Sequence, residues 1–157
     1  MRKALVAAIA LWMAGGCQAT LSPRLGIEGA SPDFLLIVLA VLAPWLPRKG
    51  AILLGFFAGI LHGAVAGANL TAYALSRTIA GFLLGSLGAL EMELSVALSM
   101  ILAALVTMLA GIVSLFLAPP PAIGSFLLAT IGSAIYNGVL AAPAHFVLGR
   151  LAFPREI

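Results

Sequence analysis

The sequence predicts an all-α fold, a polytopic membrane bundle of about six transmembrane helices that forms one domain over residues 1–157. Hydrophobic residues make up 63% of the chain and charged residues only 8%, whereas a soluble domain carries about 25% charged residues. The apolar residues also form long continuous runs, unlike the short alternating segments of a membrane barrel. A soluble fold could not cover its surface with so few polar groups, so we expect an integral membrane protein.

Charges and turn signals divide the chain into six expected helices, with five as the alternative count. A membrane helix needs roughly 20 mainly apolar residues. Gly67-Ala68-Asn69 is expected to be a tight turn, and Pro119–Pro121 should end a helix because proline lacks the N–H donor. The second apolar segment is short, with Pro44 and Pro47 near its end, and is expected to be a tilted or partial span. The expected helices cover residues 4–23, 34–47, 51–67, 70–90, 94–118 and 122–149.

The N-terminal stretch has two interpretations. Arg2 and Lys3 precede an apolar run that leads to small residues and Cys17, as in a bacterial lipoprotein leader. However, Ala14 stands where such leaders usually have leucine, and the apolar run continues to Arg24, which is long enough to span. We favour an uncleaved first helix over processing at Cys17. The single cysteine excludes an intramolecular disulfide and a cysteine-based metal cluster.

The basic residues indicate the orientation, because lysine and arginine concentrate on the cytoplasmic side. With six spans, one side would carry Arg2, Lys3, Arg48, Lys49, Arg150 and Arg155. The other side would carry only Arg24. Both termini are therefore expected in the cytoplasm, together with the loop that carries Glu91 and Glu93. The net charge of +3 then reflects orientation and not nucleic-acid binding.

Glycines recur at intervals of four in the third expected helix and again in the fourth. They are Gly55, Gly59, Gly63, Gly67, Gly81 and Gly85. On a helix, small residues at this spacing form a stripe that lets two backbones approach closely. We favour tight packing between helices of one molecule. The alternative is a docking groove for a membrane helix of a partner.

Two charged residues are expected on the outward side of the membrane. Ser31 is predicted to cap the second helix with Pro32 in its first turn, and Asp33 then lies where the helix dipole favours a negative charge. Arg77 lies about seven residues into its helix, roughly 10 Å deep at about 1.5 Å per residue. A charge inside the membrane is costly without a partner. We predict an Arg77–Asp33 pair, and the alternative is that Arg77 extends to the lipid headgroups.

The remaining polar residues inside helices are expected to be structural. Asn137 should link helices through its amide, with a contact to a partner or ligand as the alternative. His62 and His145 are isolated in sequence, and a metal site needs several ligands. The chain has no phosphate-binding loop and no GxSxG nucleophile motif. We therefore predict no enzyme activity, no cofactor and no metal.

Several short segments resemble the rod-shape-determining MreD family. They are Pro32-Asp33-Phe34-Leu35-Leu36, Arg48-Lys49-Gly50, Gly55-Phe56-Phe57-Ala58-Gly59, Ala72-Tyr73-Ala74-Leu75 and Tyr136-Asn137-Gly138. The similarity extends over nearly the whole chain, and the length, helix count and basic C-terminus are also similar. One departure is clear: the family often has an acidic residue just after its GFxxG segment, where this chain has His62-Gly63.

The resemblance implies a non-enzymatic scaffold of the bacterial inner membrane, within the elongation machinery that directs lateral wall synthesis. The partner that it implies is the single-span protein MreC, and through MreC the MreB filaments and the wall-synthesis enzymes. The resemblance also implies a fold similar to the S components of energy-coupling-factor transporters. The alternative hypothesis is therefore a vitamin-binding transporter subunit, although Asp33, Asn69 and Arg77 are the only obvious polar cluster on the outward side.

Overall fold

A computed structural model describes residues 2–90 and 94–152 of the chain. This part contains α1 (Arg2–Thr20), α2 (Phe34–Leu42), α3 (Arg48–Ala66), α4 (Leu70–Gly88), α5 (Val96–Leu117) and α6 (Ile123–Ala152), with 3₁₀ turns at Ser22–Arg24 and Ala43–Trp45. It contains no β-strand, so the all-α prediction is confirmed. Glu91, Glu93 and Arg155, used in the orientation argument, lie outside the described residues.

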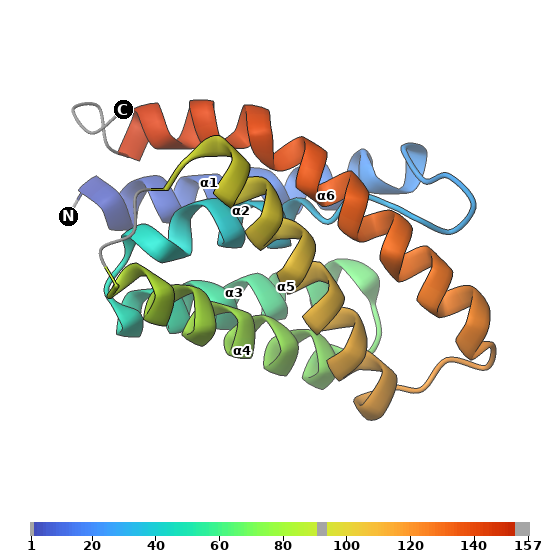
Figure 1. Cartoon of the computed structure of the whole chain (residues 1–157). Coiled ribbons are helices and arrows are strands. Elements are labelled where there is room, and N and C mark those ends of the chain that lie inside the picture. The colour runs from blue at the N-terminus through green and yellow to red at the C-terminus, as the bar shows by residue number, and fades with distance from the viewer. Residues whose placement is uncertain (1, 91–93, 153–157) are drawn as a thin grey trace.

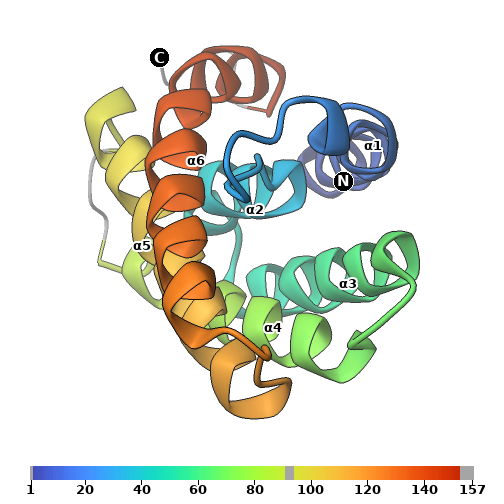
Figure 2. The same cartoon turned by 90° about the vertical axis from the view of Figure 1, so that its right-hand side faces the viewer.

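The short helix α2 is the centre of the bundle. Figure 2 shows it between α1, the α3–α4 pair and the α5–α6 pair. All of its residues from Leu35 to Leu42 are buried, as expected for a helix that is apolar all round. Its nine residues extend over only about 14 Å, whereas a membrane core is about 30 Å thick. The other five helices are long and apolar enough to cross a membrane, so α2 is the partial span that its prolines predict.

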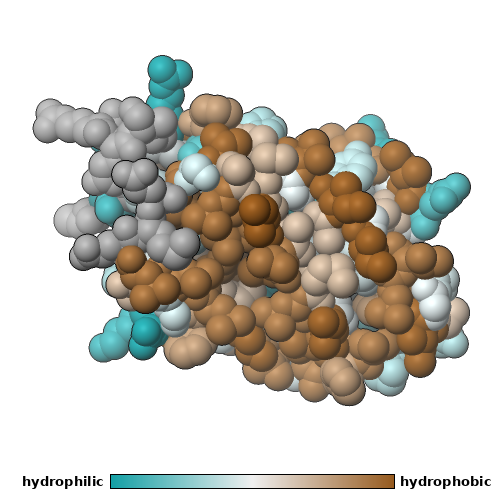
Figure 3. Space-filling model, in the orientation of Figure 1, coloured by the Kyte–Doolittle hydropathy of each residue, from teal (hydrophilic) through white to brown (hydrophobic). Residues whose placement is uncertain are grey.

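The six helices alternate in direction, which places both termini at one end of the bundle (Figure 1). We call this the proximal end, and the opposite end the distal end. Arg2, Arg48 and Arg150 lie in the end turns of helices at the proximal end, whereas Arg24 follows α1 at the distal end. Figure 3 shows an apolar surface over the middle of the bundle, with hydrophilic residues towards its two ends. These features are those of a multi-pass membrane protein.

Glycines bring α3 and α4 into close contact. A Cβ atom added to Gly55 would collide with the carbonyl group of Arg77 and would lie 3.3 Å from the Cα atom of Gly81. Added Cβ atoms on Gly59, Gly63, Gly81 and Gly85 would likewise meet atoms of the facing helix. These five glycines therefore pack the two helices of one molecule together. The alternative, that they form an open groove for a partner, is wrong because α4 occupies it.

Gly67 differs from the other glycines of the predicted stripe. It ends α3 with a left-handed φ of 66°, and a Cβ added there would meet nothing within 4 Å. Its place in the packing stripe was therefore predicted wrongly. Glycine is favoured here because it adopts positive φ without the steric cost of a side chain. The tight turn predicted at residues 67–69 is present, since α4 begins at Leu70.

The helix α2 begins at Phe34 as expected, but its capping residue lies two positions after the predicted one. Asp33, and not Ser31, is the N-cap residue, and its side chain accepts a hydrogen bond from the N–H of Leu36. Ser31 instead donates its backbone N–H to the hydroxyl of Ser133 on α6, at 3.0 Å. The Oδ1 atom of Asp33 caps the helix in this way, and its Oδ2 atom contacts Arg77 of α4. This small shift places Asp33 at the site described below.

Candidate functional site

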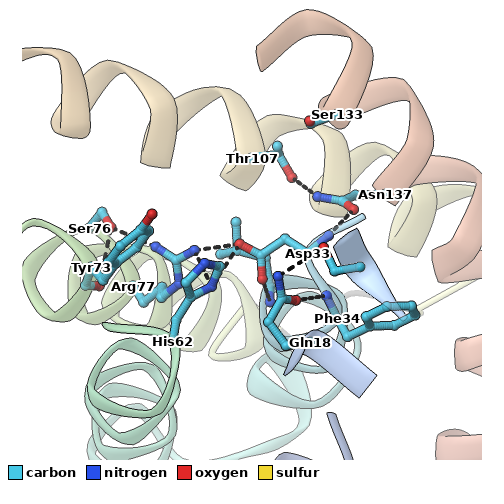
Figure 4. Close-up of polar contacts among 12 residues, drawn as sticks. Gln18, Asp33, Phe34, His62, Tyr73, Ser76, Arg77, Thr107, Ser133 and Asn137 are labelled. Atoms are coloured by element: carbon cyan, nitrogen blue, oxygen red, sulfur yellow. Dashed lines mark hydrogen bonds and ion pairs between the residues drawn. The ribbon is translucent and has the colours of Figure 1, made fainter. Parts of the chain in front are cut away.

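Arg77 of α4 and Asp33 of α2 form a buried ion pair (Figure 4). The Nη2 atom of Arg77 donates to Oδ2 of Asp33. Arg77 is only 2% exposed and Asp33 9% exposed. The predicted pair is therefore present. The alternative in which Arg77 extends to lipid headgroups is wrong, because the guanidinium lies inside the bundle.

Asn137 connects this pair to the rest of the bundle. Its Oδ1 atom accepts a hydrogen bond of 2.8 Å from the backbone N–H of Asp33. Its Nδ2 atom donates a hydrogen bond of 2.9 Å to the hydroxyl of Thr107. Asn137 is completely buried, and it joins α6 to α2 and α5. The prediction that its amide links helices is confirmed.

His62 of α3 also belongs to the cluster, which sequence reasoning missed. Its Nδ1 atom lies 2.8 Å from Nη2 of Arg77 and 3.3 Å from Oδ2 of Asp33. The imidazole of His62 therefore contacts both members of the ion pair through one ring nitrogen. The sequence feature that could have predicted this contact is the helical hairpin around residues 67–69. A turn centred near residue 68 puts His62 opposite Ala74, one helical turn from Arg77.

Tyr73 packs beside the charged groups. Its ring stacks on the ring of His62, with centroids 4.2 Å apart and an interplanar angle of 19°. The guanidinium carbon of Arg77 lies 4.7 Å from the centroid of the same ring. A cation over an aromatic face is attracted by the negative face of the ring. Tyr73 thus holds both Arg77 and His62 in position.

Gln18 fixes the segment before α2 against α1. Its Oε1 atom accepts from the N–H of Phe34 at 2.9 Å, and its Nε2 atom donates to the Ser22 hydroxyl at 3.1 Å. That hydroxyl in turn donates to the carbonyl of Pro32 at 2.7 Å. These bonds satisfy backbone groups that would be costly if left unpaired in a membrane. We define the polar cluster as Gln18, Asp33, His62, Tyr73, Arg77 and Asn137.

A cavity of about 650 Å³ lies beside the polar cluster. Every helix contributes to its wall, for example Gln18 from α1, Leu36 from α2 and His62 from α3. The connections at the distal end form its rim. Sequence reasoning did not predict this cavity, because it depends on how far apart the helix pairs stand, and the apolar pattern of each helix does not specify that distance.

We also looked for a metal site and for a reactive serine–histidine pair outside the polar cluster. Among the residues that the structure describes, no three or more histidine, cysteine, aspartate or glutamate side chains gather as a metal site would require. The hydroxyl of Ser99 lies 2.7 Å from Nδ1 of His145, but Ser99 is completely buried. This pair joins α5 to α6, the structural role that we expect for His145.

Comparison with known proteins gives no matching family model, curated protein or solved structure.

Replacing Asn137 with alanine is expected to destabilise the bundle by about 1–3 kcal/mol, the typical cost of leaving buried polar groups unsatisfied. The change removes the acceptor of the Asp33 N–H and the donor to Thr107 together. The measurement is the midpoint of thermal unfolding in detergent. Thr107→Val removes only the second of these contacts, so it should cost less than Asn137→Ala. Equal midpoints for Asn137→Ala and the unchanged protein would contradict the role of the amide.

Proposed function

We propose that the chain is a non-enzymatic scaffold of the MreD type, which binds MreC within the machinery that directs lateral wall synthesis in rod-shaped bacteria. One observation carries the proposal. Three of the five segments that resemble the family, far apart in the chain, contribute a side chain to the polar cluster, and a fourth, residues 55–59, packs against the backbone of Arg77. The hydrogen bond from Asp33 to Asn137 alone joins residues 104 positions apart.

Each of the four segments supplies a distinct part. Pro32–Leu36 supplies the cap carboxylate Asp33, and Tyr136–Gly138 supplies the amide that holds its N–H. The segment 72–75 supplies Tyr73 beneath Arg77. The segment 55–59 supplies the glycines that bring α3 against the backbone of Arg77. Short apolar matches spread by chance would have no reason to converge in space, so their convergence supports the resemblance.

The proposed location is the bacterial inner membrane with both termini in the cytoplasm. The described basic residues at the proximal end are Arg2, Lys3, Arg48, Lys49 and Arg150, whereas the distal end has Arg24. This asymmetry favours a cytoplasmic proximal end. The distal end with its cavity would then face the outside of the cell. Through MreC, the scaffold would connect indirectly to MreB filaments and wall-synthesis enzymes.

Depletion of the protein in the organism that encodes it tests this proposal. The cells should become wider and rounder as lateral wall synthesis loses its scaffold, and the measurement is cell width during depletion. Re-expression of the unchanged chain should restore the rod shape, as should the surface variant Arg24→Met. Cells that keep their width after complete depletion would contradict the proposal.

A second candidate function is a small-molecule-binding subunit similar to the S components of energy-coupling-factor transporters. The cavity favours it, because its volume of about 650 Å³ lies in the usual range for ligand pockets, roughly 300–1,000 Å³. The two functions predict different partners. A transporter subunit should co-purify with a transporter ATPase and contain a stoichiometric vitamin, whereas a scaffold should co-purify with MreC.

A further inference from the structure

The distal cavity is lined by residues from all six helices and rimmed by the connections at the distal end. Its rim includes Ser31 before α2, Asn69 before α4 and Pro119–Pro121 between α5 and α6. The polar groups of its wall include those of Asp33 and Arg77, which are buried between the helices. The prolines restrict the backbone of the rim, since each fixes φ near −65°. The chemistry of the wall then decides what kind of ligand can bind.

The charges of the cavity wall cancel. Among the described residues that line it, the acidic and basic side chains are Asp33 and Arg77, which contact each other. His62 contacts both members of this pair, with its Nδ1 atom 2.8 Å from Nη2 of Arg77 and 3.3 Å from Oδ2 of Asp33. An ionic ligand would find no surplus charge of opposite sign, and burying an unpaired ion is costly. The ligand that fits is therefore uncharged.

The remaining polar groups of the wall favour hydroxyls. The side chains of Tyr73, Ser114 and Asn69 line the cavity, and they make no hydrogen bond to other described residues. Hydroxyl and amide groups both donate and accept, so their best complement is a group that also does both. Phe126 and the rim prolines add apolar surface that can pack against C–H faces.

We propose that the cavity binds a neutral, hydroxyl-rich group of the size of a sugar or small polyol. Such a group can come from water as a free sugar, or from the membrane as the headgroup of a neutral glycolipid. The chemistry that the cavity recognises is the same for both sources. The site goes beyond the scaffold function and does not depend on MreC.

Native mass spectrometry of the full chain in a detergent without a sugar headgroup tests this proposal. The probes are octyl glucoside, octyl phosphate and octylammonium, which share one chain and differ in headgroup charge, together with free glucose. We expect a one-to-one adduct with octyl glucoside, and weaker binding of the two charged probes. Competition by glucose would indicate a water-soluble source. Binding of octyl glucoside that free glucose does not reduce would indicate that the group is the headgroup of a glycolipid. Either result supports the site.

Two variants locate the binding. Ser114→Trp fills the cavity from α5 without removing a side-chain hydrogen bond to another described residue, and should weaken octyl glucoside binding about tenfold or more, which is 1.4 kcal/mol or more. Ile112→Trp is the matched control, because Ile112 is exposed on the same helix and is not part of the cavity wall. Tyr73→Phe should weaken binding about fivefold, the value of one neutral hydrogen bond.

The proposal is overturned if octyl phosphate or octylammonium binds more tightly than octyl glucoside, if none of the probes binds, or if Ser114→Trp binds octyl glucoside as well as Ile112→Trp does. None of these results would contradict the scaffold function, because cell width during depletion and co-purification with MreC test that function separately.

Discussion

Replacing Arg77 with methionine is expected to destabilise the bundle by about 3–5 kcal/mol, the usual cost of removing one partner of a buried ion pair. The change leaves the carboxylate of Asp33 without its guanidinium in the interior of the bundle. Methionine keeps most of the length and apolar volume of the side chain, so loss of packing contributes little. The measurement is the midpoint of thermal unfolding in detergent, supported by the yield of monodisperse protein.

Two further variants separate the charge from the side chain. Arg77→Met combined with Asp33→Asn removes both charges and keeps an oxygen that can accept from the N–H of Leu36. This double variant should be more stable than Arg77→Met alone, since no unpaired buried charge remains. Arg24→Met is the control for loss of an exposed arginine and should change stability by about 0.5 kcal/mol or less. The ion pair would be unimportant if Arg77→Met unfolded at the same midpoint as Arg24→Met.

Replacing Gly55 with alanine is expected to have the second large effect, a loss of about 3 kcal/mol, at the upper end of the cost of overpacking. A single methyl group at this position collides with the carbonyl of Arg77, a backbone atom that cannot rotate away. Helices α3 and α4 would have to separate, and this movement would also displace Arg77 from Asp33. Thermal unfolding in detergent measures the loss.

Gly16→Ala is the matched control for this glycine. Gly16 is also in a helix, but a methyl group there would meet nothing within 4 Å. Alanine favours a helix by about 1 kcal/mol over glycine, so this variant should be as stable as the unchanged protein or more stable. Close α3–α4 packing would be contradicted if Gly55→Ala were as stable as Gly16→Ala.

The linear order of helices and the ion pair could be predicted from the sequence. Long apolar runs and proline or glycine turns determine where helices begin and end, and the observed bounds differ from the expected ones by only a few residues. The pair could be predicted because depth alone brings Asp33 and Arg77 to one level. The outcome that Arg77 is paired and buried follows from the high cost of an isolated charge among apolar helices.

The lateral arrangement of the helices could not be predicted in the same way. Gln18 and His62 face the cluster because of the rotation of α1 and α3 about their axes, and nearly uniform apolar sequences leave that rotation undetermined. Ser31 and Asp33 are both good capping residues. The choice between them depends on the contacts of Asp33 with Arg77 and of Ser31 with Ser133, which are on distant helices.

Co-purification tests the central claim, that this bundle is a scaffold for MreC, most directly. The full chain, tagged at its C-terminus, is co-expressed with the MreC encoded by the same genome and extracted in mild detergent. A single-span membrane protein unrelated to wall synthesis, expressed at the same level, is the control. The proposed function predicts a complex that holds MreC in fixed stoichiometry through size-exclusion chromatography. Recovery of no more MreC than of the control protein would contradict it.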